Sequence, residues 1–185
     1  MNVLLTSCGL ETEAIKRAFL EMLGKESPQI RAMFIPTAAI HPDAIEVLPK
    51  CLNDLLKCGI VRENITVYDL HDAVDVDLSE AYDVIYICGG DPDYLLRRVR
   101  EGGFDQKLEA FIRRGGVVVG VSAGSMIFAD DMPDNLGLLK CALDVHCGKD
   151  VCDKPGRYSL HRRERIRLGN EQAILFEKDS LVIVE

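Results

Sequence analysis

Residues 116–128, GVVVGVSAGSMIF, join a run of valines to a short segment that can begin a helix, and Ser122 stands at the junction. The valine run is continuously apolar, which is typical of a strand buried on both faces of a sheet. Ser122 has a glycine two residues away on each side, and this G-x-S-x-G pattern lets a chain turn sharply from strand into helix with the serine at the apex. We therefore interpret Ser122 as a candidate nucleophile. The alternative is a small residue in a structural turn.

Similar apolar runs recur along the chain, separated by segments with apolar residues every three or four positions. The runs are NVLLTS (2–7), RAMFIPTA (31–38), NITVYDL (64–70) and DVIYICGG (83–90). This alternation predicts an α/β fold of three layers, a doubly wound and mostly parallel sheet with helices on both faces. The closing stretch AILFEKDSLVIVE (173–185) reads as two strands around a polar turn, which predicts a C-terminal β-hairpin at the sheet edge.

Length and composition narrow the class of protein. With 185 residues the chain is long enough for one domain, spanning 1–185, and short for two. Hydrophobic residues at 48% and charged residues at 28% are typical of a soluble globular protein, and no apolar run is long enough to cross a bilayer. A net charge of −8 argues against nucleic acid as a partner. We therefore expect a monomer or a homodimer with neither a membrane nor a nucleic-acid partner.

The N-terminal stretch MNVLLTSCGLETEAIK (1–16) lacks the basic start and the long apolar segment of a signal peptide, so we expect a cytoplasmic protein. Its seven cysteines are then expected to be reduced thiols, and without a C-x-x-C pair they indicate neither a disulfide framework nor a zinc ribbon. A weaker alternative is metal binding, because thiolate and imidazole groups are zinc ligands. The residues for it would be Cys141, His146, Cys147 and Cys152.

A serine hydroxyl needs a base within hydrogen-bond reach, and the base needs an orienting group. The chain has four histidines: His41, His71, His146 and His161. His146 follows a short apolar segment that predicts a strand after the Ser122 turn, so we expect it at the same edge of the sheet as Ser122. His161, within the basic stretch RYSLHRRERIR (157–167), is the second choice.

Taken together, these motifs resemble those of the dipeptidase E and cyanophycinase family of serine peptidases, over most of the chain. The matching segments are TSCG (6–9), DVIYICGGDPDYLL (83–96), GVSAGSMI (120–127), NLGLLKCALDVHC (135–147), RRERI (162–166) and GNEQAILFEKDSLVIVE (169–185). The family has the class I glutamine amidotransferase-like fold, which is flavodoxin-like. The resemblance implies a peptidase that works through an acyl-enzyme, and no cofactor is indicated.

Carried onto these residues, the resemblance implies that Ser122 is the nucleophile and His146 the base. The Gly89–Gly90 turn and the backbone N–H of Ala123 would form the oxyanion hole. The third member of the triad is Asp or Glu in the family, and Glu171 in GNEQAI matches the position that precedes the final hairpin. The alternatives for that role are Asp130, Asp131 and Asp144.

The resemblance also concerns substrate binding. In aspartyl dipeptidases of the family an arginine of an RRERI-like segment receives the substrate's aspartate side chain, and Arg163 falls on that position. This implies hydrolysis of small peptides, with Asp-Xaa dipeptides as the candidate substrates. On composition alone, the same basic stretch would be a solvated surface strand or helix.

Two positions depart from the family pattern. Asp91 stands where the family commonly has asparagine, beside the expected oxyanion hole. With Arg163 it is a candidate substrate-binding residue, although a carboxylate there would oppose a developing negative charge. Ser122 and His146 are 24 residues apart, which is shorter than in the family. These departures favour an alternative, a binding protein of the same fold that has lost catalysis. A thiol-dependent amidotransferase that uses Cys88 is a weaker alternative.

Overall fold

A computed structural model describes residues 1–71, 75–159, 164–177 and 180–185 of the chain. Its main sheet has eight strands in the order β3-β2-β4-β5-β1-β9-β10-β7. The first five in that order are parallel: β3 (Ile65–Val67), β2 (Ala32–Ile35), β4 (Val84–Ile87), β5 (Val117–Val121) and β1 (Val3–Thr6). The last three run antiparallel to their neighbours: β9 (Ala173–Phe176), β10 (Ser180–Val184) and β7 (Gly156–Ser159).

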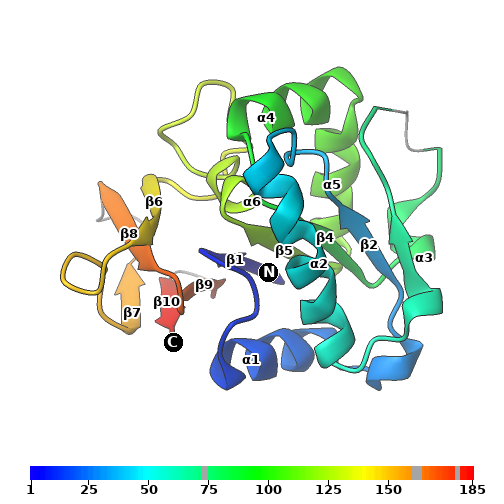
Figure 1. The fold of residues 1–185 in the computed structure, drawn as a ribbon, viewed down its shortest axis with the longest axis horizontal. Helices are drawn as coiled ribbons and strands as arrows, with labels where there is room; N and C mark the ends of the chain where they lie inside the picture. Colours follow the sequence, from blue (N-terminus) through cyan, green and yellow to red (C-terminus); the bar gives the residue numbers. More distant parts are fainter. Residues whose placement is uncertain (72–74, 160–163, 178–179) are drawn as a thin grey trace.

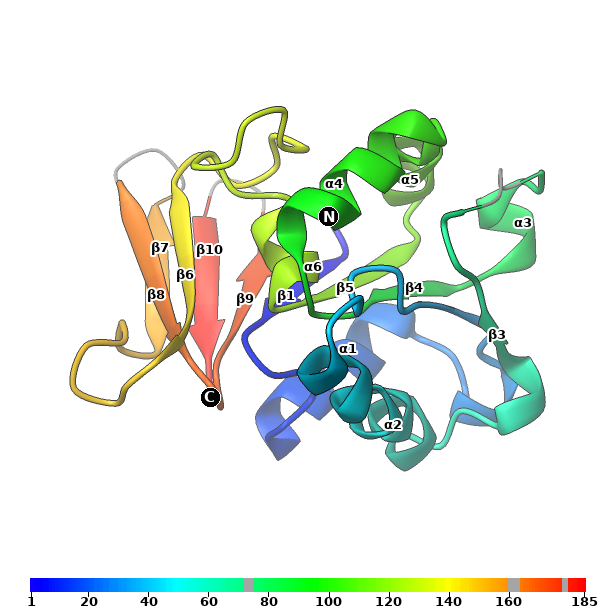
Figure 2. The same ribbon diagram turned by 45° about the horizontal axis from the view of Figure 1, so that its top comes forward.

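Helices cover both faces of this sheet, as the sequence predicts. Figure 2 shows α1 (Glu13–Leu23) and α2 (Pro42–Lys57) below the sheet. Above it lie α4 (Pro92–Glu101), α5 (Phe104–Arg113) and the short α6 (Ala123–Met126), while α3 (Leu78–Ala81) precedes β4. Two 3-10 turns, Ser27–Gln29 and Arg62–Asn64, complete the helical elements of the described chain.

The two faces of the sheet arise from side-chain alternation along each strand. In β4, Val84 and Tyr86 pack in the hydrophobic cluster between the sheet and helices α1 and α2. Ile85 and Ile87 pack in the cluster on the opposite face, between the sheet and helices α4 and α5. Because both faces of the strand are buried, its sequence is continuously apolar. This is why the apolar runs predict the three-layer fold, and the prediction is confirmed.

The predicted C-terminal hairpin is formed by β9 and β10, which pair antiparallel. Its place differs from the expectation, because β9 pairs with β1 and β7 pairs with β10, so β7 is the edge strand. The strand β7 takes its last three residues from the start of the basic stretch, and its partly exposed residues fit the surface strand that composition allowed there. No helix in the described residues is long and apolar enough to span a membrane.

A second, two-stranded sheet stands beside the main one. It pairs β6 (Ala142–Cys147) with β8 (Arg165–Gly169) in parallel, and its register shifts between Asp144 and Cys147. We call this pair the ribbon; Figure 1 shows it at the left, next to β7 and β10. Its apolar side packs into the cluster under α4 and α5 through Leu143, Ile166 and Leu168. The ribbon is thereby fixed at the side of the sheet where β1 and β5 end.

Candidate active site

Ser122 lies at the carboxyl end of β5, where the chain turns into α6. Its backbone angles are φ 50° and ψ −112°, in a region that residues with a side chain rarely adopt. The turn is tight because a Cβ on Gly120 would lie 2.4 Å from the Gly124 carbonyl oxygen, and one on Gly124 would lie 2.3 Å from that of Ile87. The glycines are therefore required for the strand and helix to approach, and the turn has the strained geometry of a nucleophile elbow.

His146 faces Ser122 from the ribbon. Its Nε2 is 2.8 Å from Ser122 Oγ, the distance of a good hydrogen bond. The imidazole reaches the main sheet from β6 because the strand is irregular at this point: His146 has φ 58° within the register shift. Its backbone N–H donates to Ser7 Oγ over 2.7 Å, which ties the ribbon to the end of β1. The structure thus brings together the two residues that the sequence pairs.

Two groups lie on the other ring nitrogen of His146. Asn170 Oδ1 is 3.2 Å from Nδ1, and Cys8 Sγ is 3.3 Å from the same atom. The expected partner, Glu171, points elsewhere, with its carboxylate 3.6 Å from Lys149 Nζ. The contact with His146 is therefore made one residue earlier in the chain than the sequence indicates.

The turn after β8 explains this difference of one residue. Gln172 closes the turn, because its backbone N–H donates to the Gly169 carbonyl at 3.1 Å and its side-chain Oε1 accepts from the Gly169 N–H at 2.9 Å. Within that closed turn Asn170 faces the site and Glu171 faces outward. An amide oxygen accepts a hydrogen bond as a carboxylate does, but a search for an acidic partner passes over it.

Two of the acidic residues considered as alternatives for this role have other partners, and the third is exposed. Asp144 pairs with Arg165 and lies 3.7 Å from Arg167 Nε. Asp131 Oδ1 is 3.4 Å from the backbone N–H of Leu143. Asp130 is exposed. Within the described residues, no carboxylate is hydrogen-bonded to the His146 ring.

The glycine turn after β4 packs directly on the elbow. A Cβ on Gly89 would lie 3.1 Å from Ser122 Cβ, and one on Gly90 would lie only 1.9 Å from the Ala38 carbonyl oxygen. Gly90 also has φ 141°, which side chains rarely allow. In the part of the chain that the structure describes, the backbone N–H groups of Gly90 and Ala123 donate to no protein acceptor. They are therefore available to a ligand.

Asp91, which follows the glycine turn, does not face the nucleophile. Its Oδ1 accepts from the backbone N–H of Tyr94 at 2.8 Å, so it caps the N-terminus of α4. Its other oxygen is 3.8 Å from His41 Nε2. The carboxylate is thus turned toward the N-terminus of α4 and not toward Ser122.

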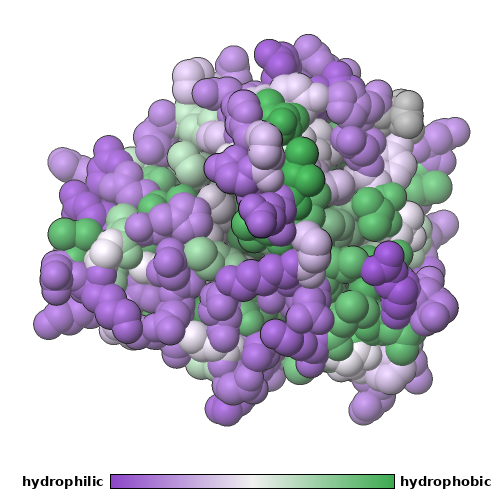
Figure 3. Space-filling model, in the orientation of Figure 1, coloured by the Kyte–Doolittle hydropathy of each residue, from purple (hydrophilic) through white to green (hydrophobic). Residues whose placement is uncertain are grey.

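A cavity of about 470 Å³ opens onto Ser122 and His146. It is bounded by the loop after β1, by α2, by the glycine turn and by the elbow. Asp43 and Lys50, both on α2, are its charged lining residues among those described. Figure 3 shows hydrophobic residues from the upper centre of this view toward its right side, with mostly hydrophilic residues on the left. Arg163 and His161 lie outside the described residues.

The other cysteines and histidines considered lie in surroundings that indicate a structural role. Cys88 is fully buried, and burial raises the pKa of its thiol well above the ordinary value, which disfavours the thiolate that a nucleophile needs. Cys8 is half-buried and burial raises the pKa of its thiol too. His71 Nε2 lies 3.0 Å from the Tyr94 hydroxyl. Over the described residues, no group of three or more His, Cys, Asp or Glu could hold a metal ion.

Two solved structures resemble this chain in fold. A protein of Listeria monocytogenes EGD-e named as a "putative peptidase E" superposes with a TM-score of 0.77 at 17% identity, over 100% of this chain and 98% of that one. A peptidase from an acI-B1 Actinobacterium superposes with a TM-score of 0.65 at 18% identity, over 98% of this chain and 86% of that one. At these identities the likeness shows the fold.

No curated protein matches the chain at a significant level. The profile of peptidase family S51 matches residues 3–136, which include β1, the glycine turn and the elbow. That match covers well over half of the chain and ends before the ribbon. The chain therefore belongs to peptidase family S51 and is a serine-type peptidase.

Proposed function

We propose that the protein hydrolyses short peptides through Ser122, His146 and Asn170. The observation that carries the proposal is the 2.8 Å contact between Ser122 Oγ and His146 Nε2 at a strained strand-to-helix turn. A serine in a merely structural turn needs no imidazole at its hydroxyl, and the backbone strain would be an uncompensated cost.

His146 accepts the Ser122 proton on Nε2 while Oγ forms a bond to the carbonyl carbon of the scissile peptide. The tetrahedral intermediate collapses when the C–N bond breaks, and the departing amine takes that proton from His146. A water molecule then gives a proton to His146 and attacks the ester carbon. The proton returns to Ser122 as the acid product leaves, and the enzyme is restored.

Asn170 orients the imidazole in this proposal. Its Oδ1 accepts from Nδ1–H at 3.2 Å, which selects the tautomer whose Nε2 lone pair faces Ser122. Unlike the acid that we expected at this position, an amide adds no charge to stabilise the imidazolium. The ring is therefore oriented without an ionic partner.

The oxyanion of the intermediate would be bound by the backbone N–H groups of Gly90 and Ala123. Each such donor contributes roughly 3 to 4 kcal/mol of transition-state stabilisation in enzymes of this type. Gly89 allows this arrangement, because any larger residue there would press on Ser122 Cβ.

The finer substrate assignment rests on other grounds. A preference for Asp-Xaa dipeptides is supported by the matching position of Arg163 in RRERI and by the modest cavity. The sequence further supports a cytoplasmic monomer or homodimer, without nucleic-acid or membrane partners. Because the net charge is −8, the protein as a whole repels an acidic substrate, so the site needs its own cations to attract one.

The test combines a fluorophosphonate probe with a panel of Asp-Xaa and unrelated dipeptides. We expect the wild type to be labelled and Ser122→Ala to lose both labelling and hydrolysis. The matched control is Ser125→Ala, since Ser125 belongs to the same turn but its Oγ is buried and donates to the Thr6 and Gly120 carbonyls at 2.8 Å. A folded wild type that neither reacts with the probe nor cleaves any member of the panel would refute the proposal.

A further inference from the structure

One face of α2 forms the wall of the cavity that faces Ser122. Asp43, Val47 and Lys50 all line the cavity, and their spacing of four and then three residues places them on one side of a helix. We call these three residues the α2 stripe. Since Ser122, His146 and Gly90 line the same cavity, whatever is cleaved there lies against the stripe.

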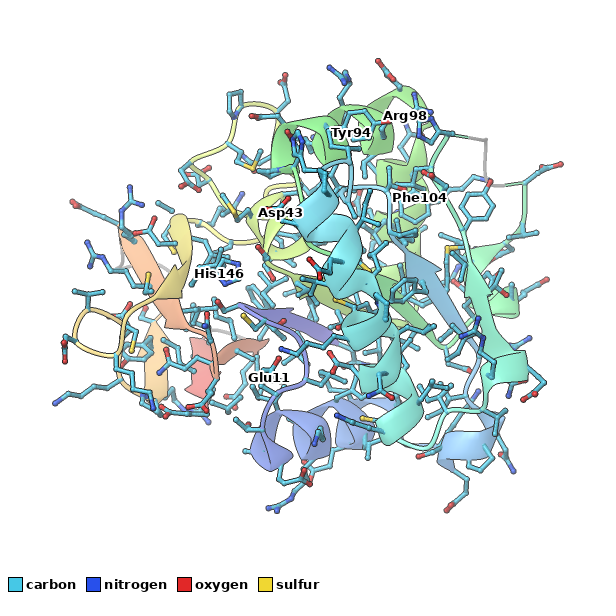
Figure 4. All side chains as sticks on the ribbon, viewed as in Figure 1. Glu11, Asp43, Tyr94, Arg98, Phe104 and His146 are labelled. Atoms are coloured by element: carbon cyan, nitrogen blue, oxygen red, sulfur yellow. The ribbon has the colours of Figure 1, made fainter. Side chains whose placement is uncertain are left out.

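The stripe carries opposite charges at its two ends. Asp43 lies in the first turn of α2, and Lys50 follows seven residues later, which is about 10 Å along the helix axis at 1.5 Å per residue. Between them, Val47 is apolar and 48% exposed. In Figure 4, Asp43 lies toward one end of α2 and Glu11 toward the other, with His146 at an intermediate height beside the helix. Glu11 marks the position of the Lys50 ammonium, since the two are 2.5 Å apart.

Both charged groups of the stripe can still bind a ligand in the folded protein. In the described residues Asp43 forms no ion pair or hydrogen bond, and an acid in the first turn stabilises a helix only weakly at the surface. Lys50 is 56% exposed and its ammonium has three donors, so the pairing with Glu11 leaves donors for a second acceptor. The pattern is therefore negative, apolar, positive along a wall about 10 Å long.

We infer that the α2 stripe recognises the two ends of a short unblocked peptide. Asp43 binds the free α-ammonium group, Lys50 binds the α-carboxylate, and Val47 contacts the apolar part between them. An extended chain advances about 3.3 to 3.6 Å per residue, so the rise of about 10 Å between the two helix positions corresponds to about three residues, and the reach of the Lys50 side chain also allows two. The substrates of this site are then dipeptides and tripeptides with both termini free. Longer chains, which cannot place both termini on the stripe, are excluded.

This inference rests on the peptidase function proposed above, and its test uses substrates whose ends can be blocked one at a time. The probes are Asp-Leu and Ala-Leu-Ala, each as the free peptide, the N-acetyl peptide and the C-terminal amide. We expect each blocking group to raise KM about tenfold or more, with a smaller effect on kcat, because a contact with a substrate terminus is made in the ground state as well as in the transition state.

Variants of the stripe then show which residue binds which end of the peptide. Asp43→Asn raises KM for the free peptide about tenfold and leaves KM for the N-acetyl peptide unchanged. Lys50→Gln raises KM about tenfold for the peptide with a free C-terminal carboxylate and leaves KM for the C-terminal amide unchanged. The double variant Glu11→Gln/Lys50→Gln separates the loss of the ammonium from the effect of a Glu11 carboxylate left without its cation, since Glu11 is only 24% exposed. The matched controls are Asp93→Asn, which changes the Pro-Asp start of α4 away from the cavity, and Lys57→Gln in the last turn of α2.

The fluorophosphonate probe has neither an ammonium nor a carboxylate group, so it reports on Ser122 alone. We expect equal labelling rates in the wild type and in both stripe variants. If labelling and hydrolysis are normal but free and blocked peptides react equally, the stripe inference is wrong while the peptidase function stands. The same holds if Asp43→Asn impairs free and N-acetyl peptides alike. If the wild type is neither labelled nor active, the peptidase function is wrong and the inference falls with it.

Discussion

Ser122 lies at the end of a strand that is buried on both faces, whereas His146 lies on the irregular, solvent-exposed part of a two-stranded ribbon. On the serine side, the backbone itself sets the geometry, through the close approaches at Gly90, Gly120 and Gly124. On the histidine side, contacts of side chains set it: Ser7 holds the backbone, and Asn170 and Cys8 lie on the ring.

This difference separates folding from catalysis. Changes on the serine side disturb the packing of strand against helix and should affect stability. Changes on the histidine side remove contacts of exposed side chains and should affect rate alone. The family match, which covers residues 3–136, spans the first side and stops before the second, where the amide of Asn170 contacts the imidazole.

The largest effect is expected for His146→Asn. Asparagine tolerates the positive φ of this position, so the backbone is retained while the base is removed. We expect kcat/KM to fall about 10⁴-fold or more and the free energy of unfolding to change by less than about 0.5 kcal/mol. Kinetics and denaturant unfolding of the same samples measure both. Activity within tenfold of the wild type would remove His146 from the mechanism.

Next is Gly124→Ala, on the serine side. The added Cβ would lie 2.3 Å from the Ile87 carbonyl oxygen, so strand and helix must separate. We expect a loss of about 3 kcal/mol or more in unfolding free energy. Gly148→Ala is the control on the histidine side, because nothing lies within 4 Å of its added Cβ. Equal unfolding midpoints for the two variants would contradict the proposed difference between the sides.

Asn170→Ala should lower kcat roughly 10- to 100-fold with little change in KM, since it releases the imidazole ring without touching the substrate. Asn170→Asp should restore activity and move the acidic limb of the pH–rate profile to higher pH, because a carboxylate favours the protonated ring. Glu171→Ala is the control and should be near neutral, as that carboxylate faces Lys149. A large loss in Glu171→Ala with none in Asn170→Ala would return the role to the acid.

Ser122→Gly tests whether strain is stored at the elbow. Glycine adopts φ 50° and ψ −112° without steric cost, so this variant should be inactive yet about 1 kcal/mol more stable than the wild type. Ser125→Gly, at a helical position in the same turn, should instead be destabilised. Thermal unfolding compares them, and a destabilised Ser122→Gly would argue against strain.

The smallest effect concerns Asp54, which is buried beneath the loop after β1 and accepts from Tyr86 Oη at 2.7 Å and from the Leu10 N–H at 3.0 Å. Burial raises the pKa of the Asp54 carboxyl above its usual value. Folding therefore favours the protonated form, and this group's contribution is fully present below the unfolded pKa and lost as pH rises through the folded pKa.

We therefore expect the stability of the wild type to fall relative to that of Asp54→Asn as pH rises from about 3 to neutrality. Unfolding curves measured at several pH values test this, with Asp93→Asn as an exposed control. Parallel stability profiles for the wild type and Asp54→Asn would show that the carboxyl is not shifted. Any change in activity would come indirectly, through the loop that carries Ser7.

Much of the serine side could be predicted from the sequence, because its determinants are local. Continuous apolar runs indicate strands buried on both faces, and G-x-S-x-G after such a run indicates the elbow at Ser122. The glycine turn at Gly89–Gly90 follows from the same reasoning, since parallel strands end at one edge of the sheet. His146 was also identified, as a polar residue at the end of a predicted strand.

The three-layer α/β architecture and the strained turn at Ser122 follow from the sequence alone, because they depend on hydrophobic period and turn chemistry within a few residues. His146 is predicted from its place at a strand end, because parallel strands end at one edge of a sheet. That Asn170 and not Glu171 meets the imidazole depends on the three-dimensional fold, because the turn after β8 closes against a strand 24 residues away. The three-dimensional fold likewise decided that Asp91 caps a helix and that one face of α2 lines the cavity. Those relations join segments far apart in the chain, and no local pattern records them.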